Sequence, residues 1–401
     1  MSFLSMNFLL FLSVAILGYY VIPKRLQWVW LLLFSYIFYL ASGTTAVVFI
    51  LATTITTFLA GLILEYMDGK MDRELNGQTA GKLNGQTTGG LNSQTTWNPD
   101  TQPEKQTIPP PVPSSAATTS TSPLTPEQKK AVKARFKRNK KWIAAAALLI
   151  NFGILAVLKY RNFAVGNINQ LFGTDFALGK LILPLGISFY TFQLLSYVVD
   201  VYRKEVAAQP AYWKLLLYCS LFHQCIAGPI VRYQTVAAEI DDRKVTLTDL
   251  TNGIRRFSIG LAKKAILANG CASVADTLLA NTQSATTAGL WLGMLFYMLQ
   301  IYLDFSAYSD MAIGMGQMVG FHYLENFNYP YSSVSVQDFW RRWHISLSSF
   351  FRDYVYIPLG GSRGGDLLTV RNMLIVWALT GIWHGASWNY ILWGLYFFVF
   401  L

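Results

Sequence analysis

Two of the four histidines in this chain stand among apolar and aromatic residues. His384 lies in TGIWHGASWN, between the apolar runs LIVWAL and YILWGLYFFVF, and His344 lies in QDFWRRWHISLSSFFRDYVY. Ionisable groups at membrane depth are costly and by default mark a functional site. Desolvation disfavours the charged imidazole, and a neutral imidazole can take a proton from a hydroxyl. The two histidines therefore predict proton transfer rather than metal binding, with His384 as candidate general base and a hydrogen bond between helices as its structural alternative.

The residues around each histidine add to this prediction. Small residues beside His384 let other atoms come close, and Trp383 provides an aromatic wall. Around His344, helical spacing predicts one shared face made of Trp340, His344, Leu347, Ser348 and Phe351. Three arginines stand nearby and are suited either to a phosphate-bearing donor or to bracing a loop: Arg341, Arg342 and Arg352. The alternative for Gln337–Tyr356 is an interfacial helix with snorkelling arginines and an aromatic belt.

Acidic and sulfur-containing residues suggest no further chemistry. Asp304 and Asp310 lie in the apolar stretch YLDFSAYSDM, and we expect structural pairing for both, with Tyr308 or an arginine as candidate partner of Asp304. The sequence has no HExxH motif, no nucleophilic serine elbow and no cluster of metal-ligating residues. Its three cysteines lack CxxC spacing and are predicted to be free thiols. We therefore predict neither a bound metal nor a bound cofactor.

The elements that must hold these residues are membrane helices. Hydrophobic residues make up 53% of the 401 and charged residues 13%, where a soluble domain carries about 25% charge. Long apolar runs occur at Phe3–Ile22, Gln27–Ala41, Thr45–Leu64, Trp142–Leu158, Leu181–Tyr202, Tyr212–Val231, Gly289–Gly320 and Met373–Leu401. Pro184 with Gly186, and Gly228 with Pro229, interrupt two of them and predict broken or re-entrant helices. The fold class is an all-α polytopic membrane protein.

Charge and composition divide the chain. Eight Lys or Arg lie between Lys129 and Lys141, so the net charge of +11 reflects membrane topology and lipid headgroups rather than nucleic acid. From residue 67 to 126 the sequence carries LNGQT repeats and a Pro/Ser/Thr tract, which predict a disordered cytoplasmic linker. Residues 1–66 are then N-terminal transmembrane helices and residues 127–401 a catalytic core. Thr125 and Gln128 predict a capping box where order resumes.

Several long motifs together resemble the membrane-bound O-acyltransferase (MBOAT) family, in its alginate O-acetyltransferase branch. They are FWRRWHISLSSFFRDYVYIPLGG, LTGIWHGASWNYILWG, YLDFSAYSDMAIG and GFHYLENFNYPY, with PLGISFYTFQLLSYVVDVYR and IAGPIVRY also similar. The resemblance covers about Leu181–Leu401. It implies a bundle of transmembrane and re-entrant helices around a tunnel, in which the signature histidine maps onto His384 and a second family position maps onto His344.

The resemblance also implies an activity. Family members move an acyl group from a cytoplasmic thioester to a hydroxyl, and this branch implies an acetyl group from acetyl-CoA passed outward to O-acetylate an exported polysaccharide. A separate extracytoplasmic acetyltransferase is the implied partner, and the bacterial plasma membrane the implied location. In this scheme His384 is the general base, His344 positions or polarises the acyl group, and Trp383, Trp340 and the three arginines contact donor or substrate. A covalent acyl-histidine is left open.

The chain departs from the family pattern in three places. The 67–126 segment is an insertion, and His223 and Gln224 stand where relatives tend to have an aromatic–proline pair. Trp388–Leu401 provides 14 residues, too few for a span, so we expect further helices after Leu401. Two other functions remain as alternatives: D-alanyl transfer to teichoic acid from a carrier-protein thioester, and a transporter or channel, for which inverted repeats are expected but not seen.

Overall fold

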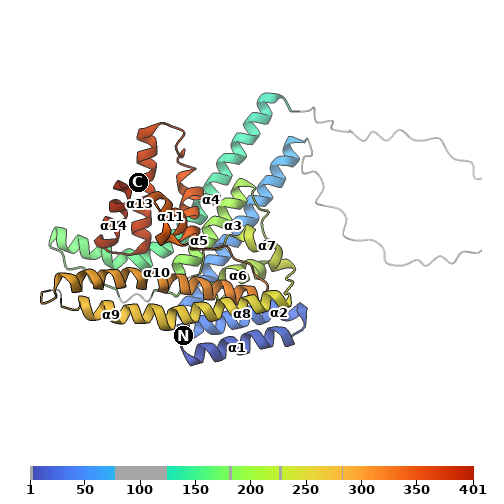
Figure 1. Ribbon diagram of the computed structural model, residues 1–401. Helices are drawn as coiled ribbons and strands as arrows, with labels where there is room; N and C mark the ends of the chain where they lie inside the picture. The colour runs from blue at the N-terminus through green and yellow to red at the C-terminus, as the bar shows by residue number, and fades with distance from the viewer. Residues whose placement is uncertain (1–2, 77–123, 180–182, 225–227, 282) are drawn as a thin grey trace, which may run out of the picture. The chain divides into compact units, whose positions relative to one another are not determined.

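The computed structural model describes residues 3–76, 124–179, 183–224, 228–281 and 283–401, and within these ranges the regular elements are all helices (Figure 1). Three are long and apolar enough to cross a membrane: α3 (Thr44–Leu75), α4 (Pro126–Phe172) and α10 (Thr287–Met318). The predicted fold class is confirmed. The protein is an all-α, multi-pass membrane protein.

The other helices are shorter. In chain order they are α1 (Met6–Val21), the 3₁₀ turn η1 (Lys24–Leu26), α2 (Gln27–Leu40), α5 (Ile187–Arg203), α6 (Tyr212–Ser220), α7 (Tyr233–Asp241), α8 (Leu247–Ala262), the π-helical η2 (Lys263–Ala268), α9 (Asn269–Leu279), the 3₁₀ turn η3 (Pro330–Ser332), α11 (Val336–Arg342), α12 (Ile345–Phe351), the π-helical η4 (Arg352–Tyr356), α13 (Asp366–His384) and α14 (Trp388–Val399). Two compact units result, Met1–Glu65 with Lys141–Leu401, and Tyr66–Lys140.

The smaller unit corrects the start of the predicted linker. Residues 67–75 are helical, because α3 continues to Leu75, so disorder cannot begin at residue 67. Two ion pairs within this unit stabilise the charged end of the helix: Asp68 with Lys140 (2.6 Å) and Glu74 with Arg135 (2.7 Å). Residues 77–123, with the LNGQT repeats, lie outside the described residues.

The predicted capping box at the start of α4 is confirmed. The Gln128 backbone N–H donates to the Thr125 hydroxyl (3.3 Å), and the Thr125 backbone N–H donates to the Gln128 side chain (2.9 Å). These two bonds satisfy donors that the first turn of a helix otherwise leaves without partners. The helix therefore begins at Pro126 as the sequence indicated.

In the larger unit, the interrupted apolar runs give short helices, as predicted. In the run that holds Pro184, the helix α5 begins only at Ile187, after Gly186 in the left-handed conformation (φ 71°). In the run that ends at Val231, α6 already ends at Ser220. Residues 225–227, including Cys225, lie outside the described residues, and the free state predicted for Cys219 and Cys271 is confirmed.

Helices α8, η2 and α9 follow one another without a loop and lie along α10 (Figure 1). The backbones of α8 and α10 come very close. A Cβ added at Gly253 would lie 2.8 Å from the Gly314 carbonyl oxygen, and one added at Gly260 would lie 2.8 Å from the Ala307 carbonyl oxygen. Small residues are the usual means of packing helices closely in membranes, where no hydrophobic force distinguishes helix from lipid.

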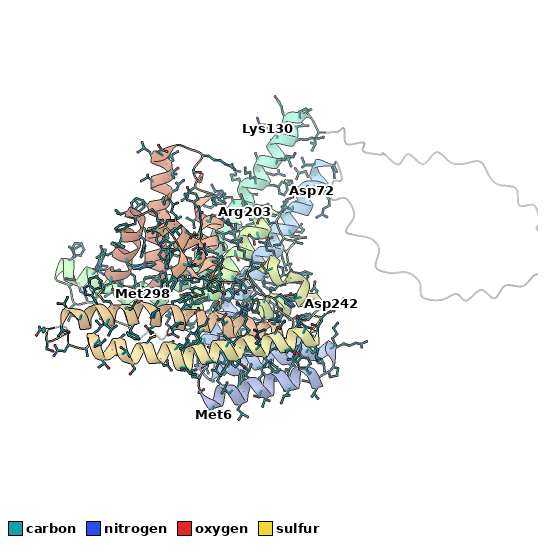
Figure 2. All side chains as sticks on the ribbon, in the orientation of Figure 1. Met6, Asp72, Lys130, Arg203, Asp242 and Met298 are labelled. Atoms are coloured by element: carbon teal, nitrogen blue, oxygen red, sulfur yellow. The ribbon has the colours of Figure 1, made fainter. Side chains whose placement is uncertain are left out.

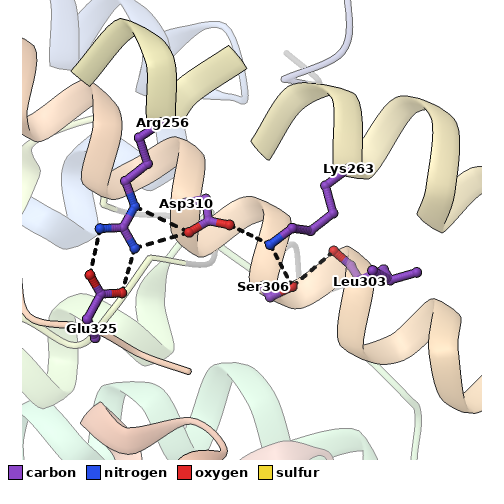
Figure 3. A network of polar contacts seen from close by, with 6 residues as sticks. All are labelled: Arg256, Lys263, Leu303, Ser306, Asp310 and Glu325. Atoms are coloured by element: carbon purple, nitrogen blue, oxygen red, sulfur yellow. Dashed lines mark hydrogen bonds and ion pairs between the residues drawn. The ribbon is translucent and has the colours of Figure 1, made fainter. Parts of the chain in front are cut away.

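Ion pairs join the same helices (Figure 3). The Asp310 carboxylate on α10 accepts from Arg256 on α8 (3.1 Å) and from Lys263 on η2 (2.6 Å). Arg256 also pairs with Glu325 (2.5 Å), in the loop after α10. Four charges are thus mutually neutralised beside the membrane-spanning α10, which is how such groups are tolerated there.

The structural pairing predicted for the two aspartates of α10 is confirmed. Asp310 has the arginine and the lysine just described. Asp304 pairs with Lys264 (2.9 Å), rather than with Tyr308 or an arginine. Lys263 and Lys264 are neighbours in the chain, and both lie in η2, where the wider π-helical turn departs from α-helical spacing.

Charged residues outside the spans connect α7 and α8 to the loop after α10. Asp242, labelled in Figure 2, follows α7 and pairs with Lys24 (2.7 Å). His322 contacts two carboxylates, Glu239 through Nδ1 (2.7 Å) and Asp249 through Nε2 (3.4 Å). Partial burial lowers the pKa of His322, but its hydrogen bonds to Glu239 and Asp249 outweigh this effect, and the pKa lies above the ordinary 6.5.

This histidine predicts a pH-dependent contact. A pKa raised by folding means that the contact stabilises the protein fully below about pH 6.5, and that this contribution is lost as pH rises through the folded pKa. We expect thermal stability to fall with rising pH over that window, and the fall to be smaller in His322→Gln. Melting in detergent across the pH series measures it. An unchanged slope in the variant would assign the pH dependence to other groups.

Candidate active site

His344 occupies a break between two helices, not the face of one. The sequence predicted a single helix over Gln337–Tyr356, but α11 ends at Arg342 and α12 begins at Ile345. His344 caps α12 in the left-handed conformation (φ 44°, ψ 54°). The i, i+4 relation between Trp340 and His344 is therefore wrong, although both still line the same cavity.

The break is held by the loop that follows α10. The Asn326 carbonyl accepts from the Ile345 N–H (2.9 Å), and the Asn328 N–H donates to the Arg342 carbonyl (2.9 Å). These bonds supply the backbone partners that a continuous helix would provide, so the chain can leave helical geometry at His344. Local spacing could not reveal this, because the loop is about 20 residues away in the chain.

The His344 ring is buried and enclosed by aromatic side chains. The residue is 2% exposed, and Phe305 meets its ring edge to face at 4.7 Å between centroids. Trp383 lies 6.1 Å from the His344 ring and 5.0 Å from the His384 ring. Trp383 is itself stacked on Phe192 (5.5 Å). One tryptophan therefore lies against both histidines.

His384 is the last residue of α13, where α13 and α14 come together. Its ring contacts Trp393 (4.8 Å between centroids) and stacks on Tyr390 (6.4 Å). A Cβ at Gly381 would lie 2.5 Å from the Tyr390 carbonyl, and one at Gly394 would lie 2.4 Å from the Trp377 carbonyl. The predicted close approach beside His384 is confirmed for Gly381, since it lets α14 bring aromatic rings onto the imidazole.

Two cavities meet at the histidines. One, of about 390 Å³, is lined by Trp340, Arg341, Ser348, Arg352 and neighbouring residues. The other, of about 730 Å³, is lined by Lys159, Tyr297, Phe305, Trp383, Asn389, Trp393 and others. Trp343, His344 and His384 line both. A molecule in either cavity can therefore reach the same two imidazoles from a different side.

A lysine that sequence reasoning missed stands beside His384. Lys159 of α4 donates to the Trp383 carbonyl, and its ammonium lies 5.7 Å from the centre of the Trp383 ring. Its neighbour Tyr160 donates to the Ile382 carbonyl (2.6 Å). Carbonyls near a helix end have no partner within the helix, and these two side chains supply donors. The position of Lys159, directly after the Trp142–Leu158 apolar run, is the sequence feature that could have indicated it.

The predicted arginines divide into two kinds. Arg341 and Arg352 line the 390 Å³ cavity with both histidines. Arg342 instead pairs with Asp338 one turn earlier (3.0 Å), as a brace within α11. Arg352 pairs with Asp353 (2.7 Å), whereas Arg341 has no ion pair among the residues the structure describes.

The two predicted tryptophans both lie at the site. Trp340 lines the 390 Å³ cavity and packs edge to face against Trp377 and Phe397, each at 4.9 Å. Trp383 lines the 730 Å³ cavity. The indole N–H of each is buried and has no hydrogen-bond acceptor among the described residues. A buried donor without an acceptor suits a polar ligand atom.

The part of the chain that holds both histidines matches a known protein family. Residues 202–401 match the MBOAT, membrane-bound O-acyltransferase family. The chain belongs to this family. Both histidines, both cavity arginines and the α11–α12 break lie within the matched residues, and Lys159 lies before them.

Curated relatives include a protein of the branch that the motifs resembled, and also proteins named for other activities. The protein named "Probable alginate O-acetylase AlgI" of Pseudomonas aeruginosa PAO1 is 43% identical over 264 residues, which cover 65% of this chain and 50% of the relative. The "Peptidoglycan O-acetyltransferase" of Helicobacter pylori is 38% identical over 275 residues, covering 62% and 52%. The "Teichoic acid D-alanyltransferase" of Bacillus subtilis is 31% identical over 233 residues, covering 54% and 58%.

Similarity is thus higher to the two acetylation proteins than to the D-alanylation protein. The MBOAT chain spans about half the length of the curated relatives it matches.

Proposed function

We propose that this protein is an O-acetyltransferase of the bacterial plasma membrane that serves the O-acetylation of an exported polysaccharide. The observation that carries the proposal is the pair of histidines, one of them buried, shared by two cavities. Relatives named for O-acetylation of two different polymers support the class of acceptor. We further propose acetyl-CoA, a cytoplasmic thioester, as donor and an extracytoplasmic acetyltransferase as partner.

The reaction needs one proton to move and one bond to be exchanged. A ring nitrogen of His384 takes the proton of the acceptor hydroxyl while that oxygen attacks the thioester carbonyl carbon. The C–S bond then breaks, and the leaving thiolate receives the proton from the imidazolium. His344 positions or polarises the acyl group at the same point. Trp383, which packs against both rings, holds the two imidazoles in their relative position.

The two cavities provide separate approaches for donor and acceptor. We assign the donor to the 390 Å³ cavity, because it holds Arg341 and Arg352 and its lining includes the indole of Trp340. Guanidinium groups bind phosphates through paired hydrogen bonds. Arg341, with no ion pair among the described residues, is the better phosphate ligand, and Arg352 is already engaged by Asp353. The acceptor then enters through the 730 Å³ cavity.

Two measurements test this proposal. Cells that lack the gene are complemented with it, and the esters on the exported polysaccharide are released by mild alkali and identified by mass spectrometry. We expect acetate to return with the gene. Membranes supplied with labelled acetyl-CoA should then release free CoA and transfer the label. Acetylation that is independent of the gene would overturn the proposal.

The same experiment decides between the alternatives. D-alanine in place of acetate, supplied only from a carrier-protein thioester, would assign the chain to the D-alanylation branch. A change in the amount of polymer exported, with its ester content unchanged, would indicate a transporter. Higher identity to the acetylation relatives favours acetate.

A further inference from the structure

Asn326 meets His344 through a single acceptor atom. The residue is fully buried, in the loop between α10 and η3. Its side-chain oxygen lies 3.1 Å from His344 Nδ1, and accepts from the Ser346 backbone N–H (3.2 Å) and the Ser346 hydroxyl (2.8 Å). Its Nδ2 has no partner among the described residues. All the polar contacts of this side chain therefore converge on the oxygen.

These contacts settle which end of the amide faces the histidine. Oxygen and nitrogen of an asparagine are hard to tell apart by shape, and the hydrogen-bond network must decide. A backbone N–H can only donate, so the atom that faces Ser346 N–H must be the oxygen. The same atom faces His344 Nδ1. A carboxamide oxygen can only accept, so His344 Nδ1 must carry a hydrogen.

The Ser346 hydroxyl does not alter this conclusion. It lies 3.4 Å from His344 Nδ1, farther than its 2.8 Å contact with Asn326. The Ser346 hydroxyl donates its hydrogen to the Asn326 oxygen, so only the lone pairs of the hydroxyl face the His344 ring. Both neighbours of Nδ1 are therefore acceptors for an N–H at that position.

We infer that Asn326 is a positioning residue that holds neutral His344 as the Nδ1–H tautomer and leaves the Nε2 lone pair free for the substrate. His344 Nε2 is buried and without a protein partner among the described residues, and the residue lines both cavities. This inference rests on the proposed function for its catalytic meaning. The hydrogen on Nδ1 follows from the hydrogen bonds, and the neutral state of the ring follows from its burial, which disfavours the charged form.

The tautomer narrows the role of His344. A neutral imidazole with its hydrogen on Nδ1 cannot donate from Nε2, so it cannot polarise an acyl carbonyl by hydrogen bonding. The one hydrogen of the attacking hydroxyl goes to His384, so Nε2 of His344 can accept a hydrogen bond from a different donor group of the substrate and so position it. Of the two roles open for this residue, polarisation of the acyl group is excluded and positioning is left. Polarisation of the carbonyl then falls to another donor, for which the buried Trp383 indole is available.

Other titratable groups line the two cavities with His344, so the pH dependence of activity would not report on His344 alone. These groups are His384, Lys159, Arg341, Arg352, Tyr297, Tyr356 and Tyr390. The protonation of the two ring nitrogens of His344 must therefore be measured directly. Nitrogen-15 NMR of histidine-labelled protein in detergent provides this measurement. The chain has four histidines, and the signals missing in His344→Asn identify the residue. We expect a protonated Nδ1 and a bare Nε2.

Variants test whether Asn326 is the cause. Asn326→Asp keeps an acceptor facing Nδ1 but adds a buried negative charge beside the ring, which favours the imidazolium. Nδ1 should therefore stay protonated while Nε2 gains a hydrogen, and acetylation should fall because the Nε2 lone pair is lost. Asn326→Leu should mix the tautomers and lower acetylation by about 10–100-fold, as loss of an outer hydrogen-bond partner does at metal sites. Ser346→Ala is the matched control, because it removes a bond to Asn326 but leaves Nδ1 paired. It should retain the tautomer.

The outcomes are distinguishable from failure of the proposed function. If Nδ1 of His344 carries no hydrogen in the wild-type protein, the inference is wrong even where acetylation is intact. This measurement needs only the wild-type protein, so it remains decisive if Asn326→Leu does not fold. An unchanged tautomer in folded Asn326→Leu also overturns it. An Nδ1–H tautomer in a protein that transfers no acetyl group overturns the proposed function instead.

Discussion

Replacing His384 with alanine is expected to reduce polysaccharide O-acetylation by about 10²–10⁴-fold, the usual contribution of a general base. The imidazole lies at the meeting point of both cavities, and the other imidazole that lines them, His344, is held by Asn326 in a positioning role. The measurement is the acetate released from exported polysaccharide, compared between variant and wild type at matched amounts of membrane protein.

The matched control for this variant is His322→Ala. His322 is about half exposed, is paired with Glu239 and Asp249, and lines none of the cavities described above. Its replacement removes a histidine without touching the site, so acetylation should stay at the wild-type level. If His384→Ala also retained acetylation, His384 would be a structural residue at the α13–α14 contact, and the site assignment would fail.

Replacing His344 with asparagine is expected to cost about 10²-fold or more in acetylation, within the range for acid–base groups. Asparagine is chosen because the backbone at position 344 is left-handed, a conformation that asparagine adopts more readily than most residues. Its amide can also donate to the Asn326 oxygen in place of Nδ1. The variant therefore removes the Nε2 lone pair while keeping the break between α11 and α12.

A comparison with His344→Val separates chemistry from folding. A β-branched side chain at positive φ is strained, so valine should lower thermal stability in detergent as well as acetylation. Asparagine should lower acetylation with little change in melting temperature. Equal loss of stability in both variants would indicate that His344 holds the helix break rather than acting on substrate.

Part of the site could be predicted from the sequence because it depends on composition and on short spacing. Apolar runs determine membrane helices whatever their neighbours are, since lipid leaves the backbone no other way to satisfy its polar groups. The cost of placing histidines in such runs singled out His344 and His384. The sequence could not predict that Arg341 lines a cavity while Arg342 pairs with Asp338. The two arginines are neighbours in the chain and differ only in the side of α11 on which they lie.

Composition and motifs were enough to identify a helical membrane protein of the MBOAT family and to single out two of its histidines. Three features needed the folded chain: the break in the helix at His344, the free nitrogen of its ring, and the cavities that reach it. Each of these depends on contacts between distant segments: Asn326 with residues 344–346, Lys159 with the end of α13, and α14 against Gly381. Hydrogen bonds of this kind leave no periodicity in the sequence, since each joins one particular donor to one acceptor across the fold.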